Sequence, residues 1–76
     1  LQARAAAKVV ACAKKFKSNI ILRKKDKDAD AKSIMKILML SASKGSHVEI
    51  TIDGKDQREA MCSIAELFEK GFDENV

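Results

Sequence analysis

Apolar residues recur along this chain with two alternating periods, one helical and one extended. In residues 3–15 they lie three and four positions apart, which predicts a helix with one apolar face. The segment from Asn19 to Lys25 places Ile20-Ile21-Leu22 between polar residues, which favours a strand. A charged tight connection and a second short strand, ending near Ala31, are expected to follow. The predicted inward stripe of the first helix is Ala6, Val9, Val10, Ala13 and Phe16.

The second half predicts a short helix, a strand and a longer helix. Ser33 to Leu40 forms the short apolar helix, with Ser33 as N-cap because its oxygen can accept from free N–H groups of the first turn. From His47 to Asp53 polar and apolar residues alternate, which predicts a strand with one buried face. Asp56 and Glu59 have the spacing of a capping box at the start of the last helix. The inward stripe of that helix is predicted to be Ala60, Met61, Ile64, Ala65 and Phe68, with Gly45 and Gly71 as turn and stop residues.

This order of elements predicts an α+β fold, an open-faced sandwich in which helices pack on one face of an antiparallel sheet. At 76 residues the chain is expected to be a single domain over 1–76. Because it has no Pro, Trp or Tyr, alanine and aliphatic side chains must fill the core. The apolar runs are far shorter than the roughly 20 residues that span a bilayer, so we expect no membrane contact.

Charge is distributed unevenly. Residues 1–32 hold ten Lys or Arg and three Asp, a net charge of +7, whereas residues 33–76 hold five basic and eight acidic residues, a net charge of −3. The basic half suits an acidic partner or phosphate, but it also suits a simply solvated surface. A small RNA-binding domain is a further alternative. The acidic last helix and the absence of Tyr and Trp for base stacking argue against a nucleic-acid partner.

Neither metal nor cofactor binding is expected. The three aspartates at alternate positions in 26–30 resemble the start of a calcium loop. However, Ala31 stands where that loop needs Gly, and Ile37 where it needs a bidentate Glu. Cys12 and Cys62 are too far apart for a disulfide framework or a zinc site, and we expect free, buried or half-buried thiols in a reducing cytoplasm. The only histidine, His47, has no ligand or catalytic partner at a suitable spacing.

Two segments carry the most information about function: Leu1-Gln2-Ala3-Arg4-Ala5-Ala6-Ala7 and Ala31-Lys32-Ser33-Ile34-Met35. They resemble the two functional sites of the HPr family, the small phosphocarriers of the bacterial sugar phosphotransferase system. The family's first stretch, Gly-Leu-His-Ala-Arg-Pro-Ala, is matched at Leu1, Ala3, Arg4 and Ala6. The spacing from Gln2 to Ser33 equals the distance between the family's two phosphorylation sites, and the resemblance covers the whole chain.

The departures from the family pattern concern the first site. Gln2 replaces the phosphorylatable histidine, and an amide nitrogen is neither basic nor nucleophilic, unlike neutral imidazole. Gln2 should therefore not accept phosphate from Enzyme I. Ala5 replaces the proline that normally starts the first helix, and Lys36 stands where the family commonly has Gly. Glutamine at the first site with serine kept at the second resembles the catabolite-repression HPr-like proteins of Gram-positive bacteria.

The resemblance implies a cytoplasmic regulatory protein that is not an enzyme. In this interpretation HPr kinase/phosphorylase phosphorylates Ser33, and the modified chain docks a LacI-type catabolite control repressor as its corepressor. The apolar contact would come from Ile34, Met35 and Met39, and the charged rim from Arg4 and Lys32. Enzyme I could bind without transferring phosphate. The alternative function is that of a phosphocarrier, active or degenerate.

Spacing alone favours a plainer interpretation, in which Ser33 is only a cap and the methionines are only core residues. A helix of eight residues, however, cannot bury all six of its large apolar side chains. Some of them should face solvent, where exposed methionine is common on binding surfaces.

The resemblance also implies a first strand preceding this sequence, which would pair beside the His47–Asp53 strand. Without it, that strand would be an exposed edge, prone to pairing with another chain. The catabolite-repression relatives exchange such a strand between subunits, so the resemblance allows a homodimer formed by strand exchange.

Overall fold

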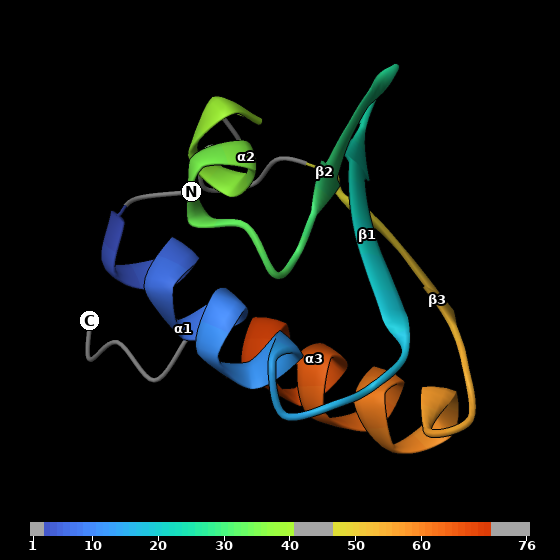
Figure 1. Ribbon diagram of the computed structural model, residues 1–76. Coiled ribbons are helices and arrows are strands. Elements are labelled where there is room, and N and C mark those ends of the chain that lie inside the picture. The colour runs from blue at the N-terminus through green and yellow to red at the C-terminus, as the bar shows by residue number, and fades with distance from the viewer. Residues whose placement is uncertain (1–2, 41–46, 71–76) are drawn as a thin grey trace.

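The computed structural model describes residues 3–40 and 47–70. Six elements follow one another in these residues, in the order predicted from the sequence. They are helix α1 (Ala3–Ala13), strands β1 (Asn19–Lys24) and β2 (Lys27–Asp30), helix α2 (Ile34–Met39), strand β3 (Glu49–Asp53) and helix α3 (Gln57–Glu69). Figure 1 shows the helices gathered on one side of the sheet, which confirms the predicted open-faced α+β sandwich.

The sheet is antiparallel, with the strand order β2-β1-β3. Leu22 at its centre pairs with Ala29 on β2 and with Ile50 on β3. The inward side chains of β1 are fully buried, whereas those of β3 are only half-buried. The face of β3 that was predicted to be buried is therefore only half-buried. Within the described sheet β3 is an edge strand with a neighbour on one side only, so less of its surface is covered.

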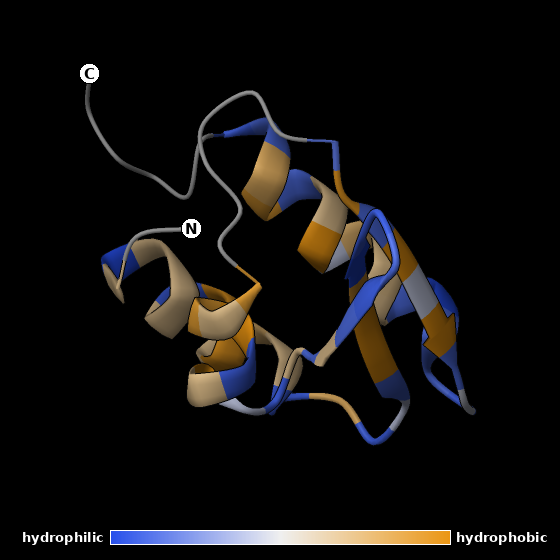
Figure 2. Ribbon diagram, turned by 90° about the horizontal axis from the view of Figure 1, so that it is seen from above, coloured by the Kyte–Doolittle hydropathy of each residue, from blue (hydrophilic) through white to orange (hydrophobic). Residues whose placement is uncertain are grey.

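Small side chains let the helices approach each other and the sheet closely. Ala6, Val9 and Ala13 on α1 are fully buried together with Ala60 and Ile64 on α3, and Figure 2 shows apolar residues concentrated where helices and sheet meet. Val10 and Phe16, also predicted to face inward, are half-buried at the border of this core.

Met61 was predicted to face inward, and that prediction is wrong. Its side chain is 38% exposed. The buried stripe of α3 consists of Ala60 and Ile64, one helical turn apart, and Met61 follows Ala60. Successive residues of a helix are rotated by about 100°, so Met61 points away from this narrow stripe.

Element ends differ from the predictions by one or two residues. Helix α1 stops at Ala13 because the N–H groups of Lys15 and Phe16 form tighter i→i−3 bonds, to the carbonyls of Cys12 and Ala13, each at 3.2 Å. Strand β1 stops at Lys24 because Lys25 adopts a positive φ of 58° and turns the chain into the hairpin. Ser33 and Leu40 are the caps of α2. The predicted roles of Gly45 and Gly71 fall outside the described residues.

Asp56 does not form the predicted capping box, because its carboxylate makes no hydrogen bond to its own helix. Instead it crosses to the turn between α1 and β1. There it accepts the backbone N–H groups of Lys17 and Ser18, at 2.8 and 2.9 Å, and the Ser18 hydroxyl. These bonds, led by the one from the Ser18 hydroxyl, lower the pKa of Asp56 to about 2. One carboxylate therefore ties two turns that are 38 residues apart.

This contact makes stability depend on pH in a definite direction. The pKa of Asp56 is lower in the folded than in the unfolded chain, so its contribution is complete above about pH 4 and is lost as the pH falls toward about 2. We expect Asp56→Asn to lower Tm at pH 7. The difference in Tm between this variant and the wild type should become smaller over that acidic range. Thermal unfolding of both proteins from pH 7 to pH 2 measures this. Asp53→Asn, an exposed neighbour, is the control, and a gap that stays constant with pH would contradict the assignment.

Candidate functional site

Ser33 is held in place by the turn between β2 and α2. Its backbone is extended, with φ −118° and ψ 113°, and its hydroxyl accepts the Lys36 N–H at 3.4 Å, which confirms it as the N-cap. The turn itself is fixed by Asp30. The Asp30 side chain accepts the Lys32 N–H at 2.9 Å, and its carbonyl accepts the Ser33 N–H at 3.0 Å. The half-buried Ser33 is therefore set at one end of a short helix by the residues just before it.

Sequence reasoning missed Asp30 as a positioning residue. The signal was available, because aspartate often bonds the backbone two residues further on and so starts a turn. The three aspartates of 26–30 were interpreted through metal binding and through their charge beside the neighbouring lysines, whereas their local hydrogen bonds were not considered.

The other predicted contact residues form an exposed apolar surface on α2. Ile34, Met35 and Met39 are 41%, 64% and 67% exposed, and we call these three residues the apolar α2 face. Ile37 and Leu40, on the opposite side of the helix, are fully or nearly fully buried. The structure thus confirms that this helix leaves part of its apolar surface in solvent. It also separates anchoring residues from exposed ones.

The predicted charged residues lie on two elements that are in contact. Lys32 is half-buried and directly precedes Ser33, whereas Arg4 is exposed in the first turn of α1. Helices α1 and α2 pack against each other, so Arg4 and Lys32 lie on neighbouring parts of the chain in space. Gln2, the counterpart of the family's phosphorylated histidine, lies outside the described residues.

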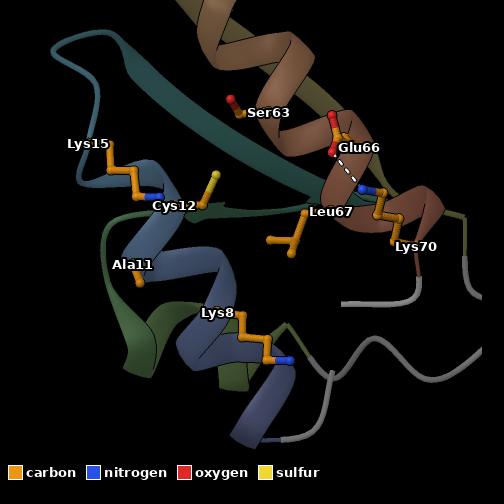
Figure 3. A pocket seen from close by; sticks show the side chains of 8 residues that line it. All are labelled: Lys8, Ala11, Cys12, Lys15, Ser63, Glu66, Leu67 and Lys70. Atoms are coloured by element: carbon orange, nitrogen blue, oxygen red, sulfur yellow. Dashed lines mark hydrogen bonds and ion pairs between the residues drawn. The ribbon is translucent and has the colours of Figure 1, made fainter. Parts of the chain in front are cut away.

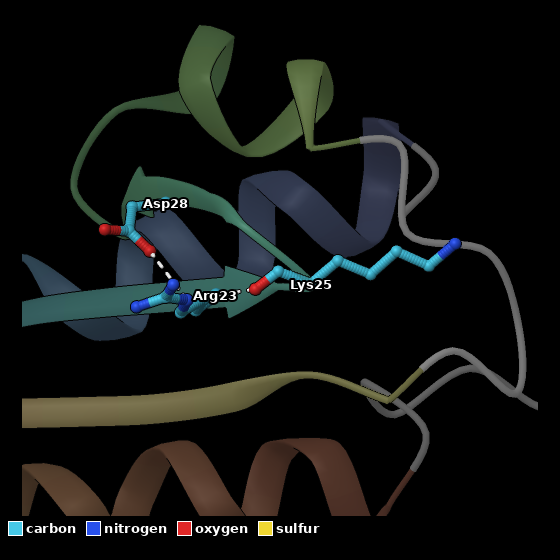
Figure 4. A network of polar contacts seen from close by, with 3 residues as sticks. All are labelled: Arg23, Lys25 and Asp28. Atoms are coloured by element: carbon cyan, nitrogen blue, oxygen red, sulfur yellow. Dashed lines mark hydrogen bonds and ion pairs between the residues drawn. The ribbon is translucent and has the colours of Figure 1, made fainter.

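A groove of about 270 Å³ lies between α2 and the β1–β2 hairpin. It is lined by Lys27, Asp28, Lys36, Met39 and Leu40. Figure 4 shows Asp28 turned to Arg23, whose guanidinium lies 3.6 Å from the carboxylate and also donates to the Lys25 carbonyl at 3.0 Å. Arg23 offsets the charge of Asp28, so the two lysines give this groove a basic character beside Met39.

A second groove, of about 410 Å³, separates α1 from α3. Cys12 lies in it, half-buried as expected and not in a disulfide, whereas Cys62 is exposed rather than buried or half-buried as expected. Burial raises the pKa of the Cys12 thiol, and the nearby Lys15 only partly opposes this. The thiol is therefore held in its protonated, weakly nucleophilic form, which argues against covalent chemistry at this position.

Comparisons with known proteins decide the family. The sequence model for the PTS HPr component phosphorylation site matches residues 1–70. The phosphocarrier protein HPr of Xylella fastidiosa strain Temecula1 is 45% identical over 76 residues, which cover all of this chain and 85% of that protein. The chain belongs to the HPr family.

Two solved structures support this assignment. The HPr dimer of Thermoanaerobacter tengcongensis superposes with a TM-score of 0.91 at 42% identity, covering 97% of this chain and 85% of the other. The catabolite-repression protein Crh of Bacillus subtilis, a domain-swapped dimer, gives a TM-score of 0.87 at 38% identity, covering 92% and 80%. The same HPr fold therefore occurs in proteins with both names.

HPr-family proteins are phosphocarriers of the phosphotransferase system and interact with its enzymes. They are not enzymes themselves, which confirms the prediction that this chain is not an enzyme. Among the described residues, no helix has the length and apolar content needed to cross a membrane. The residues at the two sites, Gln2 and Ser33, bear on whether this HPr-family member acts as a phosphocarrier or as a regulatory protein.

Proposed function

We propose that this chain is a cytoplasmic regulatory member of the HPr family, a single domain that does not carry phosphate on its first site. The observation that carries the proposal is the residue pair at the two sites, Gln2 in place of the histidine and Ser33 retained. An amide cannot take up a phosphoryl group from Enzyme I, because its nitrogen lone pair is delocalised into the carbonyl. A serine hydroxyl remains a suitable acceptor from ATP.

The surroundings of Ser33 support its role as the regulatory site. The hydroxyl accepts the Lys36 N–H at the long distance of 3.4 Å, so this hydrogen bond is weak. A phosphate there would add a charge of about −1.5 to −2 and three acceptor oxygens beside Lys32 and Lys36. The residues next in the chain begin the apolar α2 face, so charge and exposed apolar surface would be presented together.

In this proposal HPr kinase/phosphorylase modifies Ser33, and the product docks a LacI-type catabolite control repressor. The apolar α2 face supplies the contact that excludes water, and Arg4 and Lys32 flank it. Exposed methionines suit this role because their flexible side chains adapt to a partner. Enzyme I binds without phosphotransfer, and strand exchange is the proposed route to a homodimer.

Incubation with HPr kinase/phosphorylase and ATP, followed by mass spectrometry, tests the serine site. We expect a single phosphate mapped to Ser33, loss of that phosphate in Ser33→Ala, and repressor binding only by the phosphorylated protein. Ser63→Ala is a matched control, because this half-buried serine lies on α3. An unmodified wild type, or repressor binding that Ser33→Ala leaves undiminished, would refute this function.

The second candidate function is that of a phosphocarrier, which the names of the similar curated proteins favour. An assay for transfer of labelled phosphate from phosphoenolpyruvate through Enzyme I distinguishes the regulatory function from the phosphocarrier function. We expect no label on the wild type and acid-labile label on Gln2→His, because imidazole restores the nucleophile. His47→Ala in both backgrounds checks that the only native histidine is not the acceptor. Label on the wild type would establish the phosphocarrier instead.

A further inference from the structure

The methionines of this chain differ in how far each side chain is exposed to solvent. Met35 and Met39 on α2 are 64% and 67% exposed, whereas Met61 on α3 is 38% exposed. The sequence contains no other methionine. Residues four apart lie on the same side of a helix, so the α2 pair places two thioethers on one surface. A small oxidant dissolved in water therefore reaches these two side chains more readily than the one on α3.

The side chain of Met35 can change chemically without disturbing the fold. Helix α2 is anchored on its other side by Ile37, which is fully buried, and it begins after Ser33, whose carbonyl accepts the Ile37 N–H at 3.1 Å. Neither contact involves the Met35 side chain. Oxidation to the sulfoxide adds one oxygen and turns a flexible apolar side chain into a polar one. On an exposed side chain that oxygen stays in water, so the folded state loses little stability.

The two cysteines are the other sulfur groups that an oxidant could attack. Cys12 is half-buried, and Figure 3 shows its side chain turned from α1 into the groove that it lines together with Leu67 of α3. Burial raises the pKa of the Cys12 thiol, so little of the reactive thiolate is present there. Cys62 is exposed, so its oxidation has to be separated from that of Met35 by a variant.

We propose that Met35 is a reversible oxidation site that controls docking by the apolar α2 face. The oxidant is hydrogen peroxide. The Met35 sulfur gives an electron pair to one peroxide oxygen, the O–O bond breaks and an S–O bond forms. Sulfur is thereby oxidised by two electrons, and the second peroxide oxygen leaves as water. A methionine sulfoxide reductase reverses the step with two thiols, which form a disulfide while the sulfoxide oxygen leaves as water.

The effect of this oxidation on docking rests on the proposed function. The apolar α2 face begins directly after Ser33, so the phosphate and the sulfoxide would belong to one surface. In an apolar contact the sulfoxide oxygen loses its bound water and gains no hydrogen bond in return, which opposes docking. Phosphorylation of Ser33 would thus permit repressor binding, and oxidation of Met35 would cancel it.

Treatment of the full chain with hydrogen peroxide, followed by peptide mapping in a mass spectrometer, tests the oxidation site itself. We expect Met35 to be oxidised faster than Met61 by about twofold or more, at an unchanged Tm. The Cys62→Ser variant should show the same order of rates. Equal rates at the two methionines, or a Tm that falls as Met35 is oxidised, would overturn the proposal. This readout does not need the repressor.

Repressor binding by the Ser33-phosphorylated protein tests the effect on docking. We use Met39→Leu, so that α2 holds one methionine, and a dose of peroxide that adds one oxygen to the chain. We expect this sulfoxide form to bind about tenfold more weakly, and treatment with the reductase to restore binding. Met35→Leu/Met39→Leu is the matched control, because leucine keeps an apolar side chain of similar volume. Its binding should survive and become insensitive to peroxide.

The outcomes separate this inference from the proposed function. Unchanged binding by the sulfoxide form, or an equal loss in the double-leucine control, would overturn the control of docking by Met35 and leave the role of Ser33 standing. If the unoxidised phosphorylated protein did not bind the repressor, the proposed function would fail and the control of docking with it. The relative oxidation rates of Met35 and Met61 would still decide whether Met35 is an oxidation site.

Discussion

Replacing Gly54 by alanine is expected to lower the free energy of unfolding by about 2–5 kcal/mol, from backbone strain and overpacking together. Gly54 has a φ of 155°, and a Cβ built there would lie 2.6 Å from the Cα of Ser18. Ser18 cannot easily move away, because it is buried and its N–H and hydroxyl are both bound by Asp56. The added methyl group would therefore clash with the backbone of Ser18, which the two hydrogen bonds to Asp56 hold in place.

Urea denaturation of the wild type and Gly54→Ala measures this effect. Lys55→Ala is the matched control, because the next residue is exposed and should change the free energy of unfolding by less than about 0.5 kcal/mol. A loss from Gly54→Ala below about 1 kcal/mol would mean that the two turns are not packed as described. Small domains have little stability to spare, so the expected loss is a large part of the total.

The second large effect is expected from Ile37→Ala, which should cost about 2–5 kcal/mol by leaving a cavity in the core. Ile37 is fully buried, and it is the only buried residue among Ile34–Met39. It therefore anchors the helix that carries the apolar α2 face. Losing it should loosen that helix, so repressor binding by the Ser33-phosphorylated protein is also expected to fall.

Met35→Ala is the matched comparison on the same helix. Its side chain is 64% exposed, so we expect a change in the free energy of unfolding below about 1 kcal/mol, but a comparable loss of repressor binding. Denaturation curves and binding isotherms of the two variants separate anchoring from contact. If Met35→Ala bound like the wild type, the apolar α2 face would not be the docking surface.

Family and function are decided by different residues in this protein. Among the described residues, the core that builds the sheet and helices consists of small and aliphatic side chains, and Ser33 is not one of them. A carrier and a regulator can therefore share one fold, as the similarity to both HPr and Crh illustrates. Mutations that move function between the two roles should leave stability largely unchanged. Gly54→Ala should instead lower stability, and Ile37→Ala should lower both stability and repressor binding.

The sequence by itself determined the order of the six elements, the N-cap at Ser33 and the exposed part of α2. These features follow from local rules: hydrophobic period, capping chemistry and the limited area that a short helix can bury. The chemical consequence of Gln2 also comes from the sequence alone, since it rests on the properties of an amide rather than on geometry.

Only the tertiary structure decided the features that join distant segments. Asp56 and Glu59 had the spacing of a capping box, yet the Asp56 carboxylate bonds to Ser18, because the two turns meet in space. The exposure of Met61 depends on how narrow the contact of α3 with the core is. The groove between α1 and α3 likewise exists only because two helices, more than 40 residues apart in the chain, are packed side by side. Sequence patterns report which face of an element is apolar, whereas the partner of each polar group is set by packing between elements.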